Sequence, residues 1–190
     1  MGLGTDQREA LDQCVDLINT GRSGAGEQLG DLADVIAFGR LHRVENLGAA
    51  RPGDAARLRV LRARLDSVAM SCETGDQPAA ISGLNALLAE TGAVPQIVSH
   101  DGRGPHIHVS RASAPLADRI AAHSAMGLAE LVVAGQSTRL RSCAAPGCRV
   151  AFVDSSRNQT RRYCDSRTCG NRQHVAAYRA RRSIWSQPGA

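Results

Sequence analysis

Four cysteines near the C-terminus have the residue type and the spacing of a metal site. Cys143 and Cys148 form one C-x4-C pair, and Cys164 and Cys169 form a second. Four thiolates satisfy a tetrahedral zinc ion when they arrive in two pairs from separate turns. The polar stretch between the pairs is long enough to fold back on itself. The spacing therefore predicts one structural zinc ion per chain, bound only through sulfur.

Two disulfides are the alternative use of these cysteines, and disulfides persist only in oxidising compartments. The N-terminus lacks the basic-then-apolar order of a signal peptide, and no apolar run is long enough to span a membrane. We therefore expect a cytoplasmic protein with no membrane partner, which favours the metal over the disulfides.

Catalysis at this metal is not expected. Four cysteine ligands leave no open coordination position for water, which is the mark of a structural zinc. The sequence contains no paired acidic constellation and no nucleophile elbow. The two other cysteines, Cys14 and Cys72, lie on apolar helical faces and are predicted to be buried as small hydrophobic residues. We expect a binding protein and not an enzyme.

Charge is distributed unevenly along the chain. Residues 1–138 contain 12 arginines and 16 acidic residues, a net charge of −4, whereas residues 139–190 contain 11 arginines and 2 aspartates, a net charge of +9. The chain has no lysine, so every fixed side-chain cation is a guanidinium, which suits bidentate contacts to phosphate or guanine. An acidic body with a basic end is typical of a nucleic-acid-binding module.

The helix that begins at Cys169 carries arginines along its length, and a preceding hairpin contributes more. We predict that nucleic acid, most simply duplex DNA, contacts six of them: Arg161, Arg162, Arg172, Arg179, Arg181 and Arg182. Two simpler roles stay open, namely offsetting the negative charge of the zinc centre and complementing the helix dipole. RNA binding, or a structural zinc module that docks an acidic protein partner, is the alternative function.

The C-terminal part of the chain resembles the CGNR zinc-finger family of bacteria. The match covers residues 143–182 and rests on the four cysteines, the F-V-D run at 152–154, the R-R-Y-C run at 161–164 and the C-G-N-R tetrad at 169–172. The N-terminal part resembles the helical ABATE domain that precedes this finger in the family. The resemblance implies a stress-linked transcription regulator whose finger binds DNA.

The N-terminal resemblance rests on L-I-N-T at 17–20, a glycine-rich stretch and E-Q-L at 27–29. It implies a domain that senses a small-molecule effector or forms a homodimer. Asn19, Thr20 and Glu27 are the predicted ligand-binding residues, because they carry the resemblance beside a glycine-rich loop. Asn19 has an alternative role as a helix C-cap.

Helical elements must position these residues. Apolar side chains that repeat at three- and four-residue intervals predict five helices before the cysteines. Their approximate ranges are 11–19, 31–46, 54–72, 81–88 and 116–140. Arginines 57, 59, 62 and 64 lie beside or opposite the apolar stripe of the third helix, where pairing with nearby acids is expected.

Residues 96–100 and 106–110 alternate with period two around a turn sequence and predict a β-hairpin. His106 and His108 share one face of it, with His100 across from them. A second metal site and solvated histidines are both compatible with that pattern.

The zinc module is predicted to be a treble-clef-like unit. Residues 149–154 and 160–163 would pair as a hairpin, and Val175, Tyr178 and Trp185 would pack the final helix onto it. The predicted fold class is therefore mainly α with a small β-hairpin (α+β). The predicted domains are a helical domain at 1–138 and a zinc finger at 139–185, followed by a tail at 186–190.

Overall fold

The computed structural model describes residues 4–22, 24, 26–99 and 104–185, with the backbone alone at 180 and 183–185. Its elements, in chain order, are α1 (Thr5–Arg22), α2 (Leu32–Leu41), η1 (Leu47–Ala49), α3 (Asp54–Thr74), α4 (Gln77–Glu90), β1 (Gln96–Val98), β2 (His106–His108), α5 (Leu116–Val133), η2 (Ser137–Arg139), β3 (Leu140–Ser142), β4 (Ala151–Val153), η3 (Ser166–Gly170) and α6 (Asn171–Trp185). The predicted α+β class is confirmed.

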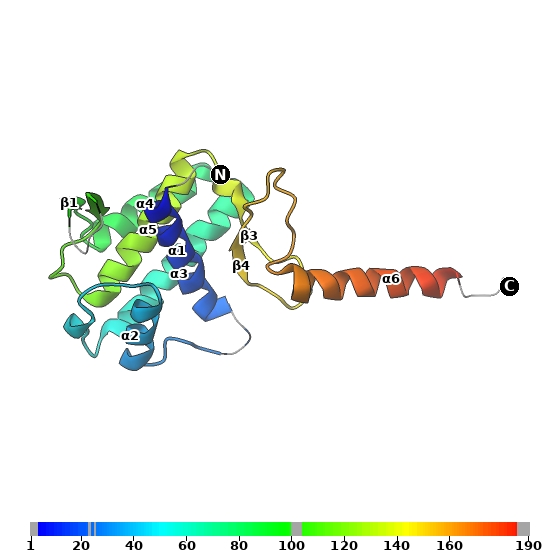
Figure 1. Ribbon diagram of the computed structural model, residues 1–190, viewed down its shortest axis with the longest axis horizontal. Coiled ribbons are helices and arrows are strands. Elements are labelled where there is room, and N and C mark those ends of the chain that lie inside the picture. The colour runs from blue at the N-terminus through cyan, green and yellow to red at the C-terminus, as the bar shows by residue number, and fades with distance from the viewer. Residues whose placement is uncertain (1–3, 23, 25, 100–103, 186–190) are drawn as a thin grey trace.

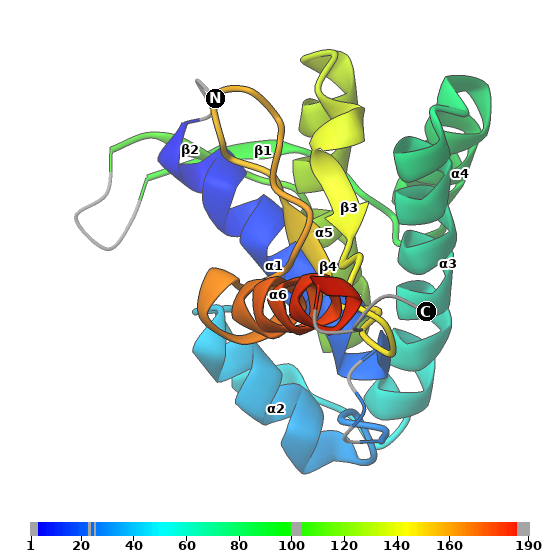
Figure 2. The same cartoon turned by 90° about the vertical axis from the view of Figure 1, so that its right-hand side faces the viewer.

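The helical body is built around α5, which packs against α1, α3 and α4, while α2 covers another side of α3 (Figures 1 and 2). The apolar stripes predicted from the sequence point into its core. The largest fully buried side chains include Leu11, Leu17, Ile18, Leu58, Leu61, Leu65, Leu87, Leu116, Ile120, Leu128 and Leu131. Burying such side chains is the main favourable term in folding.

One glycine fixes how closely α1 and α5 approach. A Cβ atom at Gly127 would lie 2.6 Å from the backbone of Ala10 and Leu11. Any larger residue would therefore push the two helices apart, and glycine is what allows this contact.

Local signals set the helix ends. Asp31 and Asp34 form a capping box at the start of α2, with Asp34 N–H donating to Asp31 Oδ1 at 3.0 Å. Gly135, at φ +66°, follows the end of α5. The predicted continuation of this helix to residue 140 is therefore wrong, and the chain turns through η2 into β3. The predicted ends of α1 and α2 are also displaced, to Arg22 and Leu41.

The predicted hairpin between α4 and α5 is confirmed in its described part. β1 and β2 pair antiparallel with Ile97 opposite Ile107. His106 and His108 lie together, with their Nε2 atoms 3.2 Å apart. His100 and most of the predicted turn lie outside the described residues.

A second two-stranded sheet joins the zinc module to the body. β3 pairs antiparallel with β4, with Arg141 opposite Phe152. Leu140 and Ala151 belong to the main core, where β3 contacts α3 and β4 contacts α1. The predicted pairing of 149–154 with 160–163 is wrong, because β4 pairs with the strand that precedes the first cysteine pair.

The final helix, α6, projects away from the rest of the molecule (Figures 1 and 2). Val175 is 40% exposed and Tyr178 is 54% exposed. The prediction that this face packs on the hairpin is wrong for these two residues, and the side chain of Trp185 lies outside the described residues. The physical reason is that the hairpin already buries apolar side chains against α1 and α3.

Candidate metal centre and arginine surface

The first cysteine pair forms the turn between β3 and β4. Cys148 N–H donates to the Ala145 carbonyl at 3.0 Å. Gly147 lies between them at φ +77°, the left-handed conformation that the third residue of a type II turn requires. Pro146 precedes it, at the position that this turn favours. The P-G sequence thereby brings Cys143 and Cys148 to the same side of the hairpin.

The second pair is positioned by a short turn at the start of the projecting helix. The Asp165 carboxylate accepts from the backbone N–H groups of Arg167 and Thr168, both at 2.7 Å. These bonds cap η3, which carries Cys169. Cys164 N–H donates to Cys143 Sγ at 3.4 Å and links the two pairs directly.

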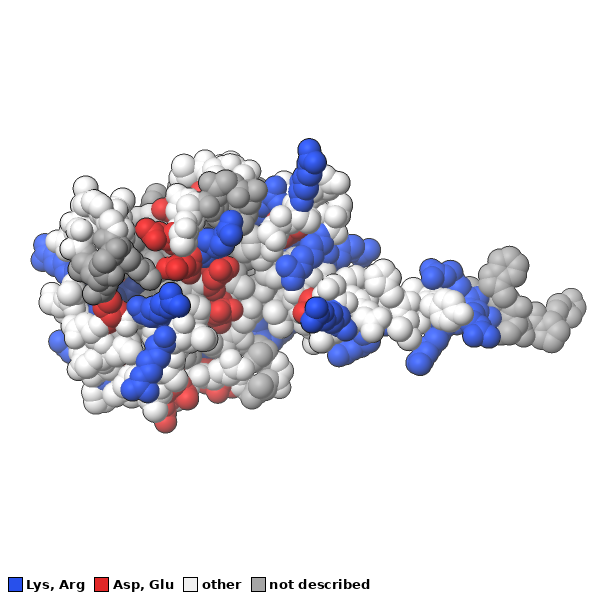
Figure 3. All heavy atoms as spheres, viewed as in Figure 1, with Lys and Arg blue, Asp and Glu red and all other residues white. Residues whose placement is uncertain are grey.

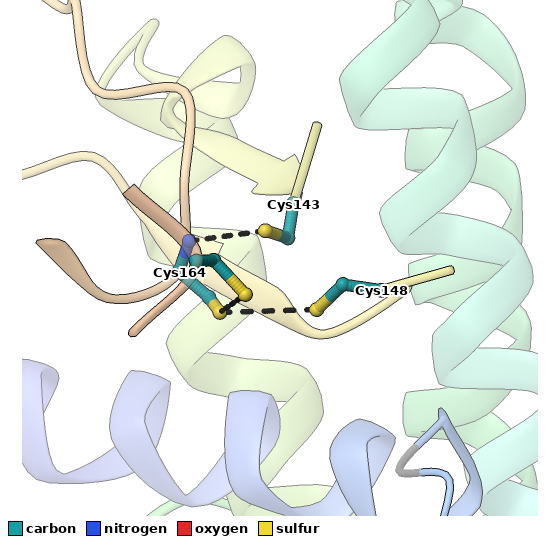
Figure 4. Close-up of side chains that lie close together, drawn as sticks. Cys143, Cys148 and Cys164 are labelled. Atoms are coloured by element: carbon teal, nitrogen blue, oxygen red, sulfur yellow. Dashed lines mark hydrogen bonds between the residues drawn. The ribbon is translucent and has the colours of Figure 1, made fainter. Parts of the chain in front are cut away.

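The four sulfur atoms converge on one point (Figure 4). All of them lie within 4.8 Å of one another. Cys164 Sγ lies 3.9 Å from Cys148 Sγ and 3.8 Å from Cys169 Sγ. A tetrahedral zinc with Zn–S bonds of about 2.3 Å requires sulfurs about 3.8 Å apart. The donor set fits a single structural zinc ion, and the four predicted ligands are the four cysteines that converge.

The four thiols differ in how readily they lose their protons. Burial raises the pKa of the Cys143 thiol, but N–H groups of Cys164 and Ala145 donate to its sulfur and hold the pKa below its ordinary value. Burial, together with the neighbouring thiols, raises the pKa of Cys148 and Cys164. Zinc binds thiolates, so metal binding offsets the cost of gathering these four groups.

Asp154 organises the loop that carries the second pair, and it was missed by the sequence reasoning. Its side chain is 0% exposed. The carboxylate accepts from Ser156 N–H at 2.9 Å, Ser156 Oγ at 2.5 Å and Arg161 N–H at 2.9 Å. Burial opposes its ionisation, but these bonds hold the pKa of Asp154 below its ordinary value. A lone acid after two apolar residues in a basic segment was the available signal.

Two arginines of the zinc module, Arg139 and Arg141, point toward the protein and bond the loop after β4. Arg139 is buried and donates to the carbonyls of Asp154 and Ser156. Arg141 donates to the carbonyl of Gln159 and lies 3.4 Å from the Asp154 carboxylate.

Arg161 was predicted to contact nucleic acid, but its guanidinium has protein partners. It lies 4.8 Å from the centre of the Phe152 ring and donates to the carbonyls of Tyr163 and Cys164. Both the cation–π contact and the donated bonds fasten the second cysteine pair. Arg161 is therefore a structural residue of the zinc knuckle in this structure.

Polar contacts fasten the module to the helical body. The Asn19 side chain pairs with the Ala151 backbone, accepting from its N–H at 2.7 Å and donating to its carbonyl at 3.0 Å. Arg22 donates to Ser142 Oγ at 2.9 Å, and Glu73 accepts from Ser142 N–H at 2.9 Å. Asn19 lies inside α1, so the C-cap alternative is wrong, and the residue acts as a clamp on β4.

Thr20 and Glu27, which were also predicted to bind a ligand, meet at Arg62. Arg62 donates to both carboxylate oxygens of Glu27, at 2.7 and 2.6 Å, and to Thr20 Oγ1 at 3.0 Å. These bonds hold the pKa of Glu27 at about 2. All three predicted ligand-binding residues thus have protein partners: Asn19 holds β4 on α1, and Thr20 and Glu27 tie the end of α1 and the loop after it to α3.

The remaining arginines separate into two groups. In the body, the pairing with acids predicted for the third helix is confirmed for three of its four arginines: Arg57 and Arg64 bond Glu90, and Arg62 bonds Glu27. Arg59 instead donates to the backbone carbonyls of Leu29 and Gly30. In the zinc module, five of the six predicted nucleic-acid contacts are exposed and have no carboxylate within ion-pair distance among the described residues. They are Arg162, Arg172, Arg179, Arg181 and Arg182. In Figure 3 blue side chains follow the projecting helix with little red beside them, whereas blue and red side chains are interspersed on the body.

Two protein-family models match the chain. Residues 139–182 match the family described as "CGNR zinc finger". Residues 11–135 match ABATE, described as "Putative stress-induced transcription regulator", and this match covers more than half of the sequence. The chain belongs to the ABATE family. A search of curated proteins found no match to this ABATE chain.

Outside the zinc centre, the ABATE chain uses its cysteines as apolar residues. Cys14 and Cys72 are free and buried, as predicted. Burial raises the pKa of Cys14 to about 12 and that of Cys72 to about 11, so both thiols are neutral. None of the described helices combines the length and apolar character needed to cross a membrane.

Proposed function

We propose that this protein is a DNA-binding transcription regulator whose projecting helix α6 and zinc knuckle contact duplex DNA. The observation that carries the proposal is the gathering of exposed arginines without acid partners on α6, within a segment, residues 139–190, whose net charge is +9. Four body arginines, among them Arg57 and Arg64, form ion pairs with acidic side chains, whereas all four arginines of α6 face solvent without a carboxylate partner in the described structure. Unpaired guanidinium groups on one element are what phosphate contacts require.

The geometry of α6 supports binding in a groove. Three arginines lie on one face of α6, because Arg179 follows Arg172 by seven residues and Arg182 follows Arg179 by three. Exposed Val175 lies on the same face and offers an apolar contact. A 15-residue helix is about 22 Å long. The major groove, about 12 Å wide, admits such a helix.

The contacts that attach the zinc module to the body support a fixed position of α6, in which it could contact DNA without rearrangement. The Asn19 clamp and the shared core hold the hairpin on the body, and zinc holds the start of α6 on the hairpin. A helix fixed at one end reaches a ligand without a large loss of backbone freedom. The four sulfur ligands leave no coordination position for water, so we assign the metal a structural and not a catalytic role.

The test is titration of the zinc-loaded full-length chain with duplex DNA at two salt concentrations. Replacing Arg179 and Arg182 together with alanine should weaken binding to every sequence and reduce the salt slope by about two, one for each lost phosphate contact. The matched control replaces two exposed body arginines, Arg8 and Arg40, with alanine and should leave the slope unchanged.

Three results would overturn the proposal. The first is undetectable binding at low salt by the folded, zinc-loaded chain. The second is an equal loss of affinity in the control variant. The third is preferential displacement of the DNA by an RNA competitor, which would favour the RNA alternative.

A further inference from the structure

We propose that the N-terminal domain binds a small zwitterionic metabolite of the amino-acid type in a polar cavity between α1, the segment after α2, β2 and α5. The cavity has a volume of about 420 Å³. That is within the usual range for small-molecule sites, about 300–1,000 Å³. It lies apart from the zinc module and from Asn19, Thr20 and Glu27, none of which lines it.

Two buried hydrogen-bond donors in the cavity wall are unsatisfied. Gln13 is 1% exposed and Arg119 is 7% exposed. Gln13 Nε2 and Arg119 Nε have no hydrogen-bond partner in the described structure. Leaving a buried donor unpaired costs about 1–3 kcal/mol, so a protein rarely keeps two at one site without a use for them.

Neighbouring groups aim these donors. His123 Nδ1 donates to Gln13 Oε1, which leaves the Gln13 amide nitrogen in the cavity wall without a partner in the described structure. Arg119 donates from Nη2 to the Asn46 carbonyl at 3.1 Å, which fixes the guanidinium plane. Arg119 and His123 are four residues apart on α5 and therefore share one face of it. A guanidinium and an amide N–H₂ that are held in this way suit the two oxygens of a carboxylate.

The rest of the wall carries the opposite charge. Asp6, Glu9 and Glu45 line the cavity with Arg43 and Arg119, so with neutral histidines the formal charge of the lining is −1. Burial lowers the pKa of both His42 and His123, which keeps these two cavity histidines neutral at pH 7. A dianionic phosphate would meet net repulsion here. A carboxylate at Arg119 with an ammonium group toward the acidic side chains matches both signs.

The test is a thermal-shift screen of the zinc-loaded full-length chain with each of the twenty free amino acids, the amines that lack their carboxylate, and inorganic phosphate. At least one amino acid should raise the melting temperature by ~5 °C or more when present at about 100 times its Kd. Its amine and inorganic phosphate should not. DNA is absent from this assay, so its outcome is independent of the proposed DNA binding.

Variants locate the site by calorimetric titration. Arg119→Gln should weaken binding of that amino acid about tenfold or more, because it removes a charged donor. The control, Arg111→Gln, makes the same change at an exposed arginine outside the cavity and should bind normally. If Arg119→Gln does not fold, Gln13→Met removes the other donor while keeping the side-chain length, and the same loss is expected.

The inference is overturned if no amino acid stabilises the protein, because the two unpaired donors would then not mark a site for this class of ligand. Stabilisation by phosphate as strong as by the amino acid would also reject the zwitterion. So would normal binding by the folded cavity variants.

Discussion

Replacing the buried Asp154 with asparagine should weaken zinc binding although this residue does not touch the metal. The carboxylate is the common acceptor for three donors, two on Ser156 and one on Arg161. Those bonds shape the loop that returns the chain to Cys164, the third ligand. Asparagine has nearly the same size but offers one acceptor oxygen and one N–H₂ group.

The magnitude follows from counting these bonds. The amide nitrogen must face at least one of the three donors, so one bond to a charged acceptor is lost, which costs about 1.5–3 kcal/mol. The same donor is then left buried and unpaired, and the other two bonds lose their charged acceptor. A total of about 3 kcal/mol corresponds to a hundredfold change in an equilibrium constant. Because metal binding is coupled to folding of the loop, zinc affinity should fall by about this factor.

The assay is competition for zinc between the protein and a chromogenic chelator, followed by optical absorption. Asp12→Asn is the matched control, because Asp12 is exposed on α1 and far from the loop in sequence. It should retain the zinc affinity of the unmodified chain. A zinc affinity for Asp154→Asn within about threefold of that control would refute the view that Asp154 positions the second cysteine pair.

Two further predictions concern the metal and pH. Cys164→Ser should reduce zinc below one ion per chain in native mass spectrometry, whereas Cys72→Ser should leave it unchanged, because only Cys164 belongs to the sulfur cluster. Hydrogen bonds from Arg62 hold the pKa of Glu27 at about 2, so its contribution to stability is present above the unfolded pKa of about 4.3 and lost as pH falls toward 2. In urea unfolding, Glu27→Gln should be less stable than the unmodified chain at pH 7 and approach it in acid; a gap that stays constant with pH would contradict this assignment.

Local sequence was sufficient for the zinc ligands. Chelation by Cys143, Cys148, Cys164 and Cys169 requires two short turns, and the spacing and the Pro146–Gly147 pair specify the first of them directly. The apolar stripes of the helices could also be predicted from local sequence, because helical hydrogen bonds join residues that are close in sequence. The observed helix ends differ from the predicted ones, because capping residues and a left-handed glycine, and not the apolar periodicity, determine where a helix ends.

Strand pairing was not determined by local sequence. β4 pairs with β3 and not with residues 160–163, because Leu140 and Ala151 together complete a core formed by distant helices. Which of two neighbouring segments a short strand joins depends on this burial and not on its own alternation.

The direction of long side chains also depended on the tertiary structure. Arg161 and Arg162 are adjacent and identical in type, yet one is held against Phe152 and the other is exposed. Asn19 bonds a strand 132 residues away. The cavity at Gln13 and Arg119 arises where α1 meets α5, far apart in the chain. The sequence by itself determined the metal, the helices and the excess of positive charge at one end, because these depend on near neighbours. The tertiary structure decided which arginines reach solvent and where buried donors stay unpaired, because these depend on contacts between distant segments.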